Sequence, residues 1–173
     1  MAKSALDVQI DNRETFAMIE NLIRKLDRPE PLLKIIGKYI QAMTSKMFAP
    51  GSRPDRNAVR GEKWPPLKMS TIFKKRLMHK KGKLTGNSPD KPLVETGALR
   101  DDLMSPKSIN ILNKGLIYGT DRKSKNGFLY PAIHEMGGSK IPQRRWLFLT
   151  NDDLNQICNT TKQWIESITT TRI

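Results

Sequence analysis

The feature that most constrains the fold of this chain of 173 residues is a pair of segments in which glycine interrupts a short apolar pattern. The first segment is LVETGALR at residues 93–100. The hydroxyl of Thr96 can accept a hydrogen bond from an amide that follows it, and Gly97 allows the backbone to turn tightly. This segment therefore predicts the beginning of a short helix over residues 96–103.

The second segment is YPAIHEMGG at residues 130–138, followed by IPQRRWL at residues 141–147. Its pattern predicts a short helix with Ile133 and His134 on one side, which two glycines then end. A proline-initiated turn follows and leads into an aromatic strand predicted over residues 145–149. Large apolar side chains alternate to both faces of that strand, which indicates that both faces are covered.

The composition is typical of a folded domain. With 37% hydrophobic and 28% charged residues, the chain is neither disordered by composition nor membrane-like. No apolar run approaches the roughly 18 residues that a membrane span needs, and the N-terminus lacks the apolar stretch of a signal peptide. We therefore expect a single domain over residues 1–173, not secreted and without a membrane partner.

The N-terminal third predicts one strand and two helices. Alternating apolar residues indicate a half-buried strand over residues 5–10, after which Asp11 or Asn12 caps a helix. Pro31 suits the first turn of a second helix. We expect both apolar stripes to pack in the core, with two methionines either filling gaps or extending to a partner. The stripes are Phe16, Ile19, Ile23 and Leu26 in the first helix, and Leu32, Ile36, Tyr39, Ile40, Met43 and Met47 in the second.

An extended basic loop region is predicted over residues 48–92. Pro, Gly, Arg and Asp dominate residues 49–63 without apolar periodicity, which indicates a long loop. Trp64 ends that loop as an apolar anchor, and a local packing role fits it better than a ligand cage does. A second flexible basic stretch is predicted over residues 80–91.

Three further elements are predicted. They are a helix capped by Ser70, a hairpin joined at residues 113–115, and a last helix capped by Thr150 or Asn151. In the hairpin, Gly115 is available for a positive φ. Together the elements predict an α+β fold, in which a small, mainly antiparallel sheet packs against helices and long basic loops project. The residues expected to face the core are Ile72, Phe73 and Leu77 after Ser70, and Leu154, Ile157, Cys158, Thr161, Ile165 and Ile168 in the last helix.

The formal net charge of +14 is concentrated in one part of the chain. Residues 53–91 carry 12 Lys and Arg against 3 Asp and Glu, which gives +9 of the +14. Three interpretations are open: a solvated basic loop, contact with an acidic partner ring, and a salt-dependent contact with DNA. No aromatic residues alternate with these lysines, and no DNA-binding motif is present, so a DNA contact would be weak. The candidate residues are Arg53, Arg56, Arg60, Lys63, Lys74, Lys75, Arg76, Lys80, Lys81 and Lys83.

No motif in the sequence indicates an enzyme, a cofactor or a metal site. The chain lacks a phosphate-binding loop, a GxSxG elbow and an HExxH pair. His134 adjoins Glu135, but the other histidine, His79, lies among lysines, and we expect His134 to be half-buried and hydrogen-bonded to the backbone. The single cysteine, Cys158, cannot form an intramolecular disulfide and is predicted to be a small buried residue.

The order of four motifs resembles the Mu-like phage virion morphogenesis family. The motifs are WPPL at residues 64–67 followed by Ser70 and Thr71, the segment 93–99, the segment 130–134 with Gly137, and residues 141–147. This family comprises tail-completion and head-tail joining proteins. The resemblance implies a structural protein of the virion neck or tail end, assembled in the host cytoplasm, which binds copies of itself in a ring expected to be a hexamer and binds other phage neck and tail proteins.

A closed ring requires that one patch of a subunit contact a different patch of the next. Our candidate patches are the turn at residues 141–145 and the short helix at residues 96–103. Arg144 can offer two hydrogen bonds to a neighbour's carboxylate, while Trp146 serves either the core or an interface. A basic DNA-binding accessory protein and an assembly chaperone are the alternative functions. The interface candidates are Thr96, Leu99, Arg100, Ile141, Pro142, Arg144, Arg145 and Trp146.

Overall fold

The computed structural model describes residues 13–48, 64–82, 90–112 and 114–170. These residues form an α+β fold, as the sequence predicts. The strand predicted over residues 5–10 and the long loop over residues 49–63 lie outside the described residues. The elements in chain order are α1 (Arg13–Leu26), α2 (Glu30–Phe48), α3 (Met69–Lys80), α4 (Ala98–Met104), the 3₁₀ turn η1 (Pro106–Ser108), β1 (Ile109–Leu112), β2 (Gly115–Tyr118), α5 (Tyr130–Met136) and α6 (Asn151–Thr170).

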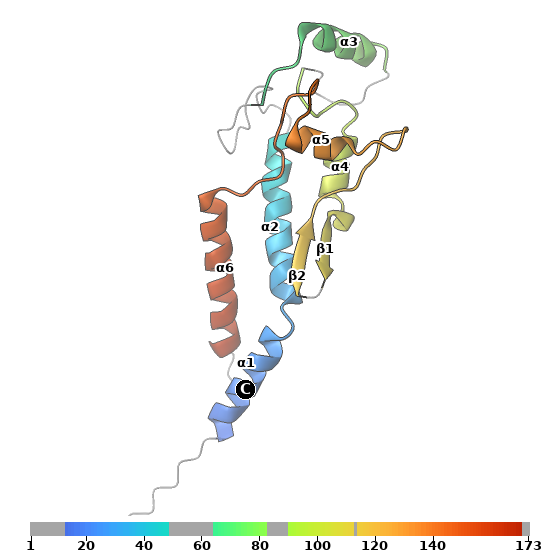
Figure 1. Ribbon diagram of the computed structural model, residues 1–173. Coiled ribbons are helices and arrows are strands. Elements are labelled where there is room, and N and C mark those ends of the chain that lie inside the picture. Colours follow the sequence, from blue (N-terminus) through green and yellow to red (C-terminus); the bar gives the residue numbers. More distant parts are fainter. Residues whose placement is uncertain (1–12, 49–63, 83–89, 113, 171–173) are drawn as a thin grey trace, which may run out of the picture.

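Helix α2 lies at the centre of the fold, between the hairpin with α4 on one side and α6 on the other (Figure 1). The side-chain amide of Gln41 donates to the carbonyl oxygens of Leu103 and Ser105, at 3.0 and 3.1 Å, and so joins α2 to the end of α4. The hydroxyl of Tyr39 donates to a carboxylate oxygen of Asp153 at 2.9 Å and joins α2 to α6. The apolar stripe of α2 is buried or half-buried along its length, which confirms that prediction.

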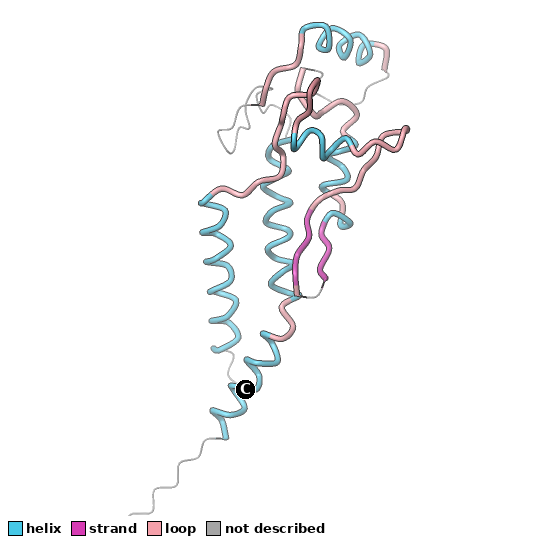
Figure 2. The backbone as a smooth tube through the Cα atoms, in the orientation of Figure 1, coloured by secondary structure: helices cyan, strands magenta, loops and turns pink. Residues whose placement is uncertain are grey.

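The sheet is the predicted hairpin of two antiparallel strands (Figure 2). Ile109 pairs with Tyr118 at one end of the register and Leu112 with Gly115 at the other. Of the two described residues of the turn, Lys114 has a positive φ, of 64°, and Gly115 does not, so the prediction that Gly115 would supply it is wrong.

The caps of three helices match their sequence signals. The amide of Ala98 donates to the hydroxyl of Thr96 at 3.3 Å, and Gly97 has a φ of 79°. Gly137 ends α5 with a φ of 77°. At the start of α6, the Asp153 carboxylate accepts the amide of Thr150 while the Thr150 hydroxyl accepts the amide of Asp153, at 2.7 and 3.2 Å.

The core gathers at the C-terminal end of α2. The rings of Phe48 and Trp64 lie 6.0 Å apart between centroids, so Trp64 is the packing anchor that the sequence predicts. Met47 fills this core rather than reaching a partner. The buried core residues here are Met47, Phe48, Trp64, Val94, Leu99, Leu103 and Trp146.

The segment at residues 145–149 forms no strand and has a bend at Leu147, so that prediction is wrong. The amides of Trp146 and Leu147 both donate to Oε2 of Glu135, at 2.8 and 3.1 Å. A carboxylate on α5 therefore takes the place that a neighbouring strand would have. The alternation of apolar residues could not reveal that a side chain would accept these two amides.

The apolar stripes of α1 and α6 are largely exposed. The side chains of Phe16 and Ile23 are 63% and 60% exposed, so the prediction that the α1 stripe packs in the core is wrong. On α6, Ile168 is buried, whereas Leu154 is 48% exposed and Cys158 is also exposed, contrary to prediction. Within the described residues, no helix is long and apolar enough to cross a membrane.

The contact between α2 and the hairpin depends on the lack of a side chain at Gly37. A Cβ atom there would lie 2.8 Å from Cγ2 of Ile109, closer than packed atoms approach. We expect Gly37→Val to lower the free energy of unfolding by about 1–3 kcal/mol, because the hairpin must move away. Urea unfolding measures this change.

The matched control is Ala42→Val, which adds the same side chain at an exposed position of α2. Its cost should not exceed about 0.7 kcal/mol, the range of helix propensity. Equal stability of the two variants would contradict the close contact.

Candidate partner-binding surface

The four sequence motifs meet in space, and buried side chains join them. We call the side chains of Trp64, Lys75, Glu135, Arg144 and Trp146 the motif junction. The indole nitrogen of Trp64 donates to the carbonyl oxygen of Arg145 at 2.8 Å, and that of Trp146 donates to the carbonyl oxygen of Pro131 at 3.1 Å. Both indoles are nearly fully buried, so core packing is the role that the structure gives Trp146.

Arg144 joins the last motif to the first. Its side chain is buried, and its guanidinium donates to the carbonyl oxygens of Pro65 and Pro66, at 2.9 and 3.3 Å. Its backbone amide donates to the carbonyl oxygen of His134 at 2.7 Å. Burial lowers the pKa of this guanidinium, which still carries its charge at neutral pH. The guanidinium of Arg144, which the sequence predicts would bind a neighbour's carboxylate, therefore forms its hydrogen bonds within its own chain.

Lys75 joins α3 to the second motif. Its ammonium group donates to the carbonyl oxygens of Lys91 and Val94, each at 3.1 Å, and the residue is buried. Burial lowers the pKa of Lys75, while the nearby carboxylates of Glu95 and Asp90 oppose that shift. The prediction that Lys75 belongs to a projecting basic segment is wrong, because its charge is used to hold main-chain carbonyls.

The attachment of α3 through Lys75 turns the apolar residues of this helix outward. Met69, Phe73 and Leu77 are 63%, 65% and 53% exposed, so the prediction that Phe73 and Leu77 face inward is wrong. Residues two positions apart on a helix lie about 200° apart around its axis, so Phe73 and Leu77 lie opposite Lys75. The cap of α3 is Lys68 rather than Ser70, and it makes no side-chain capping bond.

We call Met69, Phe73 and Leu77 the outer stripe of α3. These residues recur every fourth position and lie on one side of the helix. Lys74 and Lys80, which are exposed, come from the same helix. The outer stripe is thus an apolar strip with basic neighbours, at one end of the molecule (Figure 1).

Of the other basic candidates, Arg76 and Lys81 are described by the structure and five are not. Arg76 forms a salt bridge with Asp90, in which its Nε donates at 2.8 Å, whereas Lys81 is exposed. The remaining candidates, which are Arg53, Arg56, Arg60, Lys63 and Lys83, lie outside the described residues.

The interface candidates also differ in how exposed they are. Leu99 is buried in the core, whereas Arg100 pairs with its neighbour Asp101 at 2.7 Å and its side chain is 38% exposed. The side chain of Arg145 is 48% exposed, lies over the ring of Phe148 and pairs with Glu135 at 3.5 Å. Three further candidates remain at or near the surface: Thr96 and Pro142 are exposed and Ile141 is half-buried.

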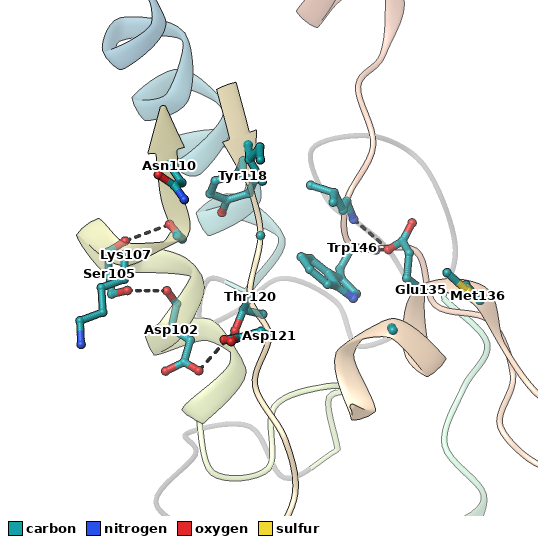
Figure 3. A pocket seen from close by; sticks show the side chains of 15 residues that line it. Asp102, Ser105, Lys107, Asn110, Tyr118, Thr120, Asp121, Glu135, Met136 and Trp146 are labelled. Atoms are coloured by element: carbon teal, nitrogen blue, oxygen red, sulfur yellow. Dashed lines mark hydrogen bonds between the residues drawn. The ribbon is translucent and has the colours of Figure 1, made fainter. Parts of the chain in front are cut away.

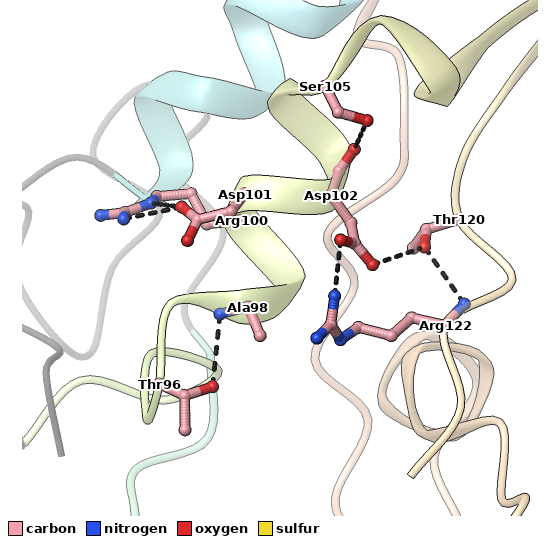
Figure 4. A network of polar contacts seen from close by, with 8 residues as sticks. All are labelled: Thr96, Ala98, Arg100, Asp101, Asp102, Ser105, Thr120 and Arg122. Atoms are coloured by element: carbon pink, nitrogen blue, oxygen red, sulfur yellow. Dashed lines mark hydrogen bonds and ion pairs between the residues drawn. The ribbon is translucent and has the colours of Figure 1, made fainter. Parts of the chain in front are cut away.

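A hollow of about 680 Å³ opens between the hairpin with α4 and the segment that carries Trp146 (Figure 3). Asp102 lies on one wall, and Glu135 and Trp146 lie on the other. Asp102 binds the guanidinium of Arg122, and the Thr120 hydroxyl lies 3.5 Å from it (Figure 4). These carboxylates are thus occupied by structural hydrogen bonds.

A second hollow, of about 730 Å³, borders α3 and α4 and is lined by basic groups and hydroxyls. His134 lines it and is half-buried, as predicted, but its Nδ1 atom is buried without a hydrogen-bond partner. Burial, and then the charge of Arg144, lower the pKa of His134 and so favour the neutral imidazole. Among the described residues, no three His, Cys, Asp or Glu side chains lie together as metal ligands.

Comparisons of this chain with family models, with curated proteins and with solved structures give no match. Among the described residues, the exposed large apolar side chains include the outer stripe of α3 and the apolar residues of α1 and α6. The apolar periodicity predicted that the stripes of α1 and α6, and Phe73 and Leu77 of α3, would face the core. The net charge of α3 was the sequence signal for its exposure, because a helix with several lysines and no acidic residue is rarely buried in a core.

The bonds of Lys75 generate a stability prediction. We expect Lys75→Met to lower the free energy of unfolding by about 1–3 kcal/mol, because two buried carbonyl oxygens lose their donor. Chemical denaturation measures the change, and Lys74→Met, at an exposed position of the same helix, should cost less than about 0.5 kcal/mol. If both variants unfold at the same denaturant concentration, Lys75 does not hold α3 to the body.

The burial of Lys91 generates a pH prediction. Desolvation lowers the pKa of Lys91 from 10.5 to about 8. Between these values the unfolded chain binds more protons than the folded one, so stability rises with pH in that window. We expect a gain of about 1 kcal/mol from pH 7.5 to 9 that Lys91→Met lacks. Identical pH profiles of the two proteins would show that Lys91 is not desolvated.

Proposed function

We propose that this protein is a structural subunit of a phage neck or tail end, which forms a homo-oligomeric ring, expected to be sixfold, that completes the tail and supports head-tail joining. The order of the four motifs supports the assignment to a phage particle. The motif junction supports a structural role for these motifs, because their conspicuous side chains hold the chain together.

The observation that carries the proposal is the amount of apolar surface left open on a single chain. Contiguous exposed apolar patches mark sites of protein association. Helices α1, α3 and α6 each expose two or more large apolar side chains, which suits a ring, because each subunit of a ring uses two unlike surfaces. The large apolar side chains exposed on these helices are Phe16, Met18, Ile19, Ile23 and Leu26 on α1, Met69, Phe73 and Leu77 on α3, and Leu154 and Ile165 on α6.

The net charge of +14 favours a second candidate, a DNA-binding accessory protein. Two of the described basic candidates support it poorly, because Lys75 is buried and Arg76 is paired with Asp90. The apolar outer stripe of α3 also has no use in a contact with phosphates.

Purified protein is expected to form closed rings, seen by negative-stain microscopy and by light scattering after size exclusion. Its affinity for duplex DNA at physiological salt should be weak in a gel shift. A monomer that binds DNA tightly would favour the second candidate. A third candidate, an assembly chaperone, would be favoured if mass spectrometry fails to find the chain in finished particles. A protein that stays monomeric and is absent from particles would contradict the proposal.

A further inference from the structure

Strand β1 has a free edge on the side that faces away from β2. The amide of Gly119 donates to the carbonyl oxygen of Ser108 at 3.0 Å, and along an antiparallel pair the residues that bond the partner strand alternate. The backbone groups of Ile109 and Ile111 therefore point to the free edge. The Ile109 amide donates to the carbonyl oxygen of Pro106. Among the described residues, none hydrogen-bonds the Ile109 carbonyl or either backbone group of Ile111.

A mostly apolar groove of about 390 Å³ lies between this edge and α2. We call it the β1 groove. Residues of β1 and of α2 line it, and none of β2 does, so it follows the free edge. An extended segment that lies in such a groove can bond the strand edge and place alternate side chains against the helix. The lining residues include Lys34, Lys38, Met104, Pro106, Ile109 and Ile111.

The sequence contains a segment that fits the β1 groove. The predicted strand at residues 5–10 has Leu6, Val8 and Ile10 in alternation with polar residues. In an extended backbone these three side chains point to one side, as an apolar groove requires. A strand also needs a partner strand, and β1 offers an edge without one.

Charge favours the same segment. Residues 5–12 contain Asp7 and Asp11 and no basic residue, whereas the β1 groove is lined by Lys34 and Lys38 and by no acidic residue. Both lysines are exposed, and within the part of the chain that the structure describes neither has a carboxylate partner. An acidic segment is therefore attracted to this groove.

The segment of the same chain cannot lie along the β1 groove. Helix α1 is about 21 Å long and extends away from the hairpin, whose turn residue Lys114 pairs with Asp27 just after α1 (Figure 1). From Arg13 back to Ile10 the backbone spans at most about 10 Å. Ile10 therefore stays roughly 10 Å short of the hairpin turn even where the backbone folds straight back. The segment that fills the groove must come from another copy.

We propose that residues 5–10 of one copy add to the free edge of β1 in the next copy as a third strand, with Leu6, Val8 and Ile10 in the β1 groove. This inference rests on the proposed ring. Each copy gives one segment and receives another, so the contact joins two unlike surfaces and propagates from copy to copy. The backbone groups of Ile111 gain partners in the assembly.

Cross-linking tests the exchange directly. Gln9 faces away from the groove in the added strand, on the same side as Asn110, which is exposed. One subunit carries Gln9→Cys and a second carries Asn110→Cys, both with Cys158→Ser, which removes the single natural cysteine. Produced together and treated with a short bismaleimide, they should give linked dimers on denaturing gels, and neither should do so alone. Asp7→Cys in place of Gln9→Cys tests the neighbouring register.

Two controls fix the interpretation. Lys162→Cys, at an exposed position of α6, replaces Asn110→Cys and should give no linked dimer. A single chain with both Gln9→Cys and Asn110→Cys should give a ladder of linked copies. If the link forms only within one chain, which runs as a monomer, the exchange between copies is overturned.

A second measurement does not depend on cross-linking geometry. Val8→Lys should weaken self-association roughly tenfold or more by sedimentation, because a charge would enter an apolar groove lined by two lysines. Ser4→Lys adds the same charge outside the strand and should leave self-association unchanged. Rings that form without either link and survive Val8→Lys would overturn the strand exchange and leave the proposed function standing. A protein that is monomeric at every concentration would overturn both.

Discussion

The structure depends on buried side chains that hydrogen-bond the main chain of its loop segments. The described sheet has only two short strands, so it satisfies few backbone groups. Buried amides and carbonyls must still find partners, because an unpaired one costs a large part of the stability of a small domain. Arg144, Lys75, Glu135 and the two indoles of the motif junction provide those partners.

This arrangement explains why motifs far apart in the sequence carry such distinctive residues. Arg144 reaches the carbonyls next to Trp64, and Trp146 reaches the start of α5. It also explains how α3 comes to present an apolar strip to solvent. The lysine that holds the helix occupies the inner side, so the apolar residues two positions away lie on the outer side. Part of the basic charge that suggests a binding patch in the sequence therefore lies inside the protein.

Local signals in the sequence were sufficient for most elements. The hairpin, the short helices α4 and α5, and the capped α6 follow from glycines, hydroxyl caps and periodicity, and the structure confirms them. The prediction for residues 145–149 was wrong because alternating apolar residues do not show what accepts the backbone amides, and here the Glu135 carboxylate accepts two of them.

The location of the apolar stripes could not be predicted for a different reason. Periodicity shows which residues share a face of a helix, but it does not show whether the covering surface belongs to the same chain. The stripe of α2 is covered, whereas that of α1, with Phe16 and Ile23, is open. Arg144 was predicted to bind a neighbouring subunit, because the residues around it in the sequence do not show that two proline carbonyls would lie beside it.

Native-state hydrogen exchange tests the central claim most directly. The amides of Arg144, Trp146 and Leu147 donate to the His134 carbonyl and the Glu135 carboxylate, within a segment that has no strand partner. If the motif junction holds the fold together, these three amides exchange as slowly as those in the middle of α2, through global unfolding. Exchange as fast as in the loop between β2 and α5 would show that the junction is incidental to the fold.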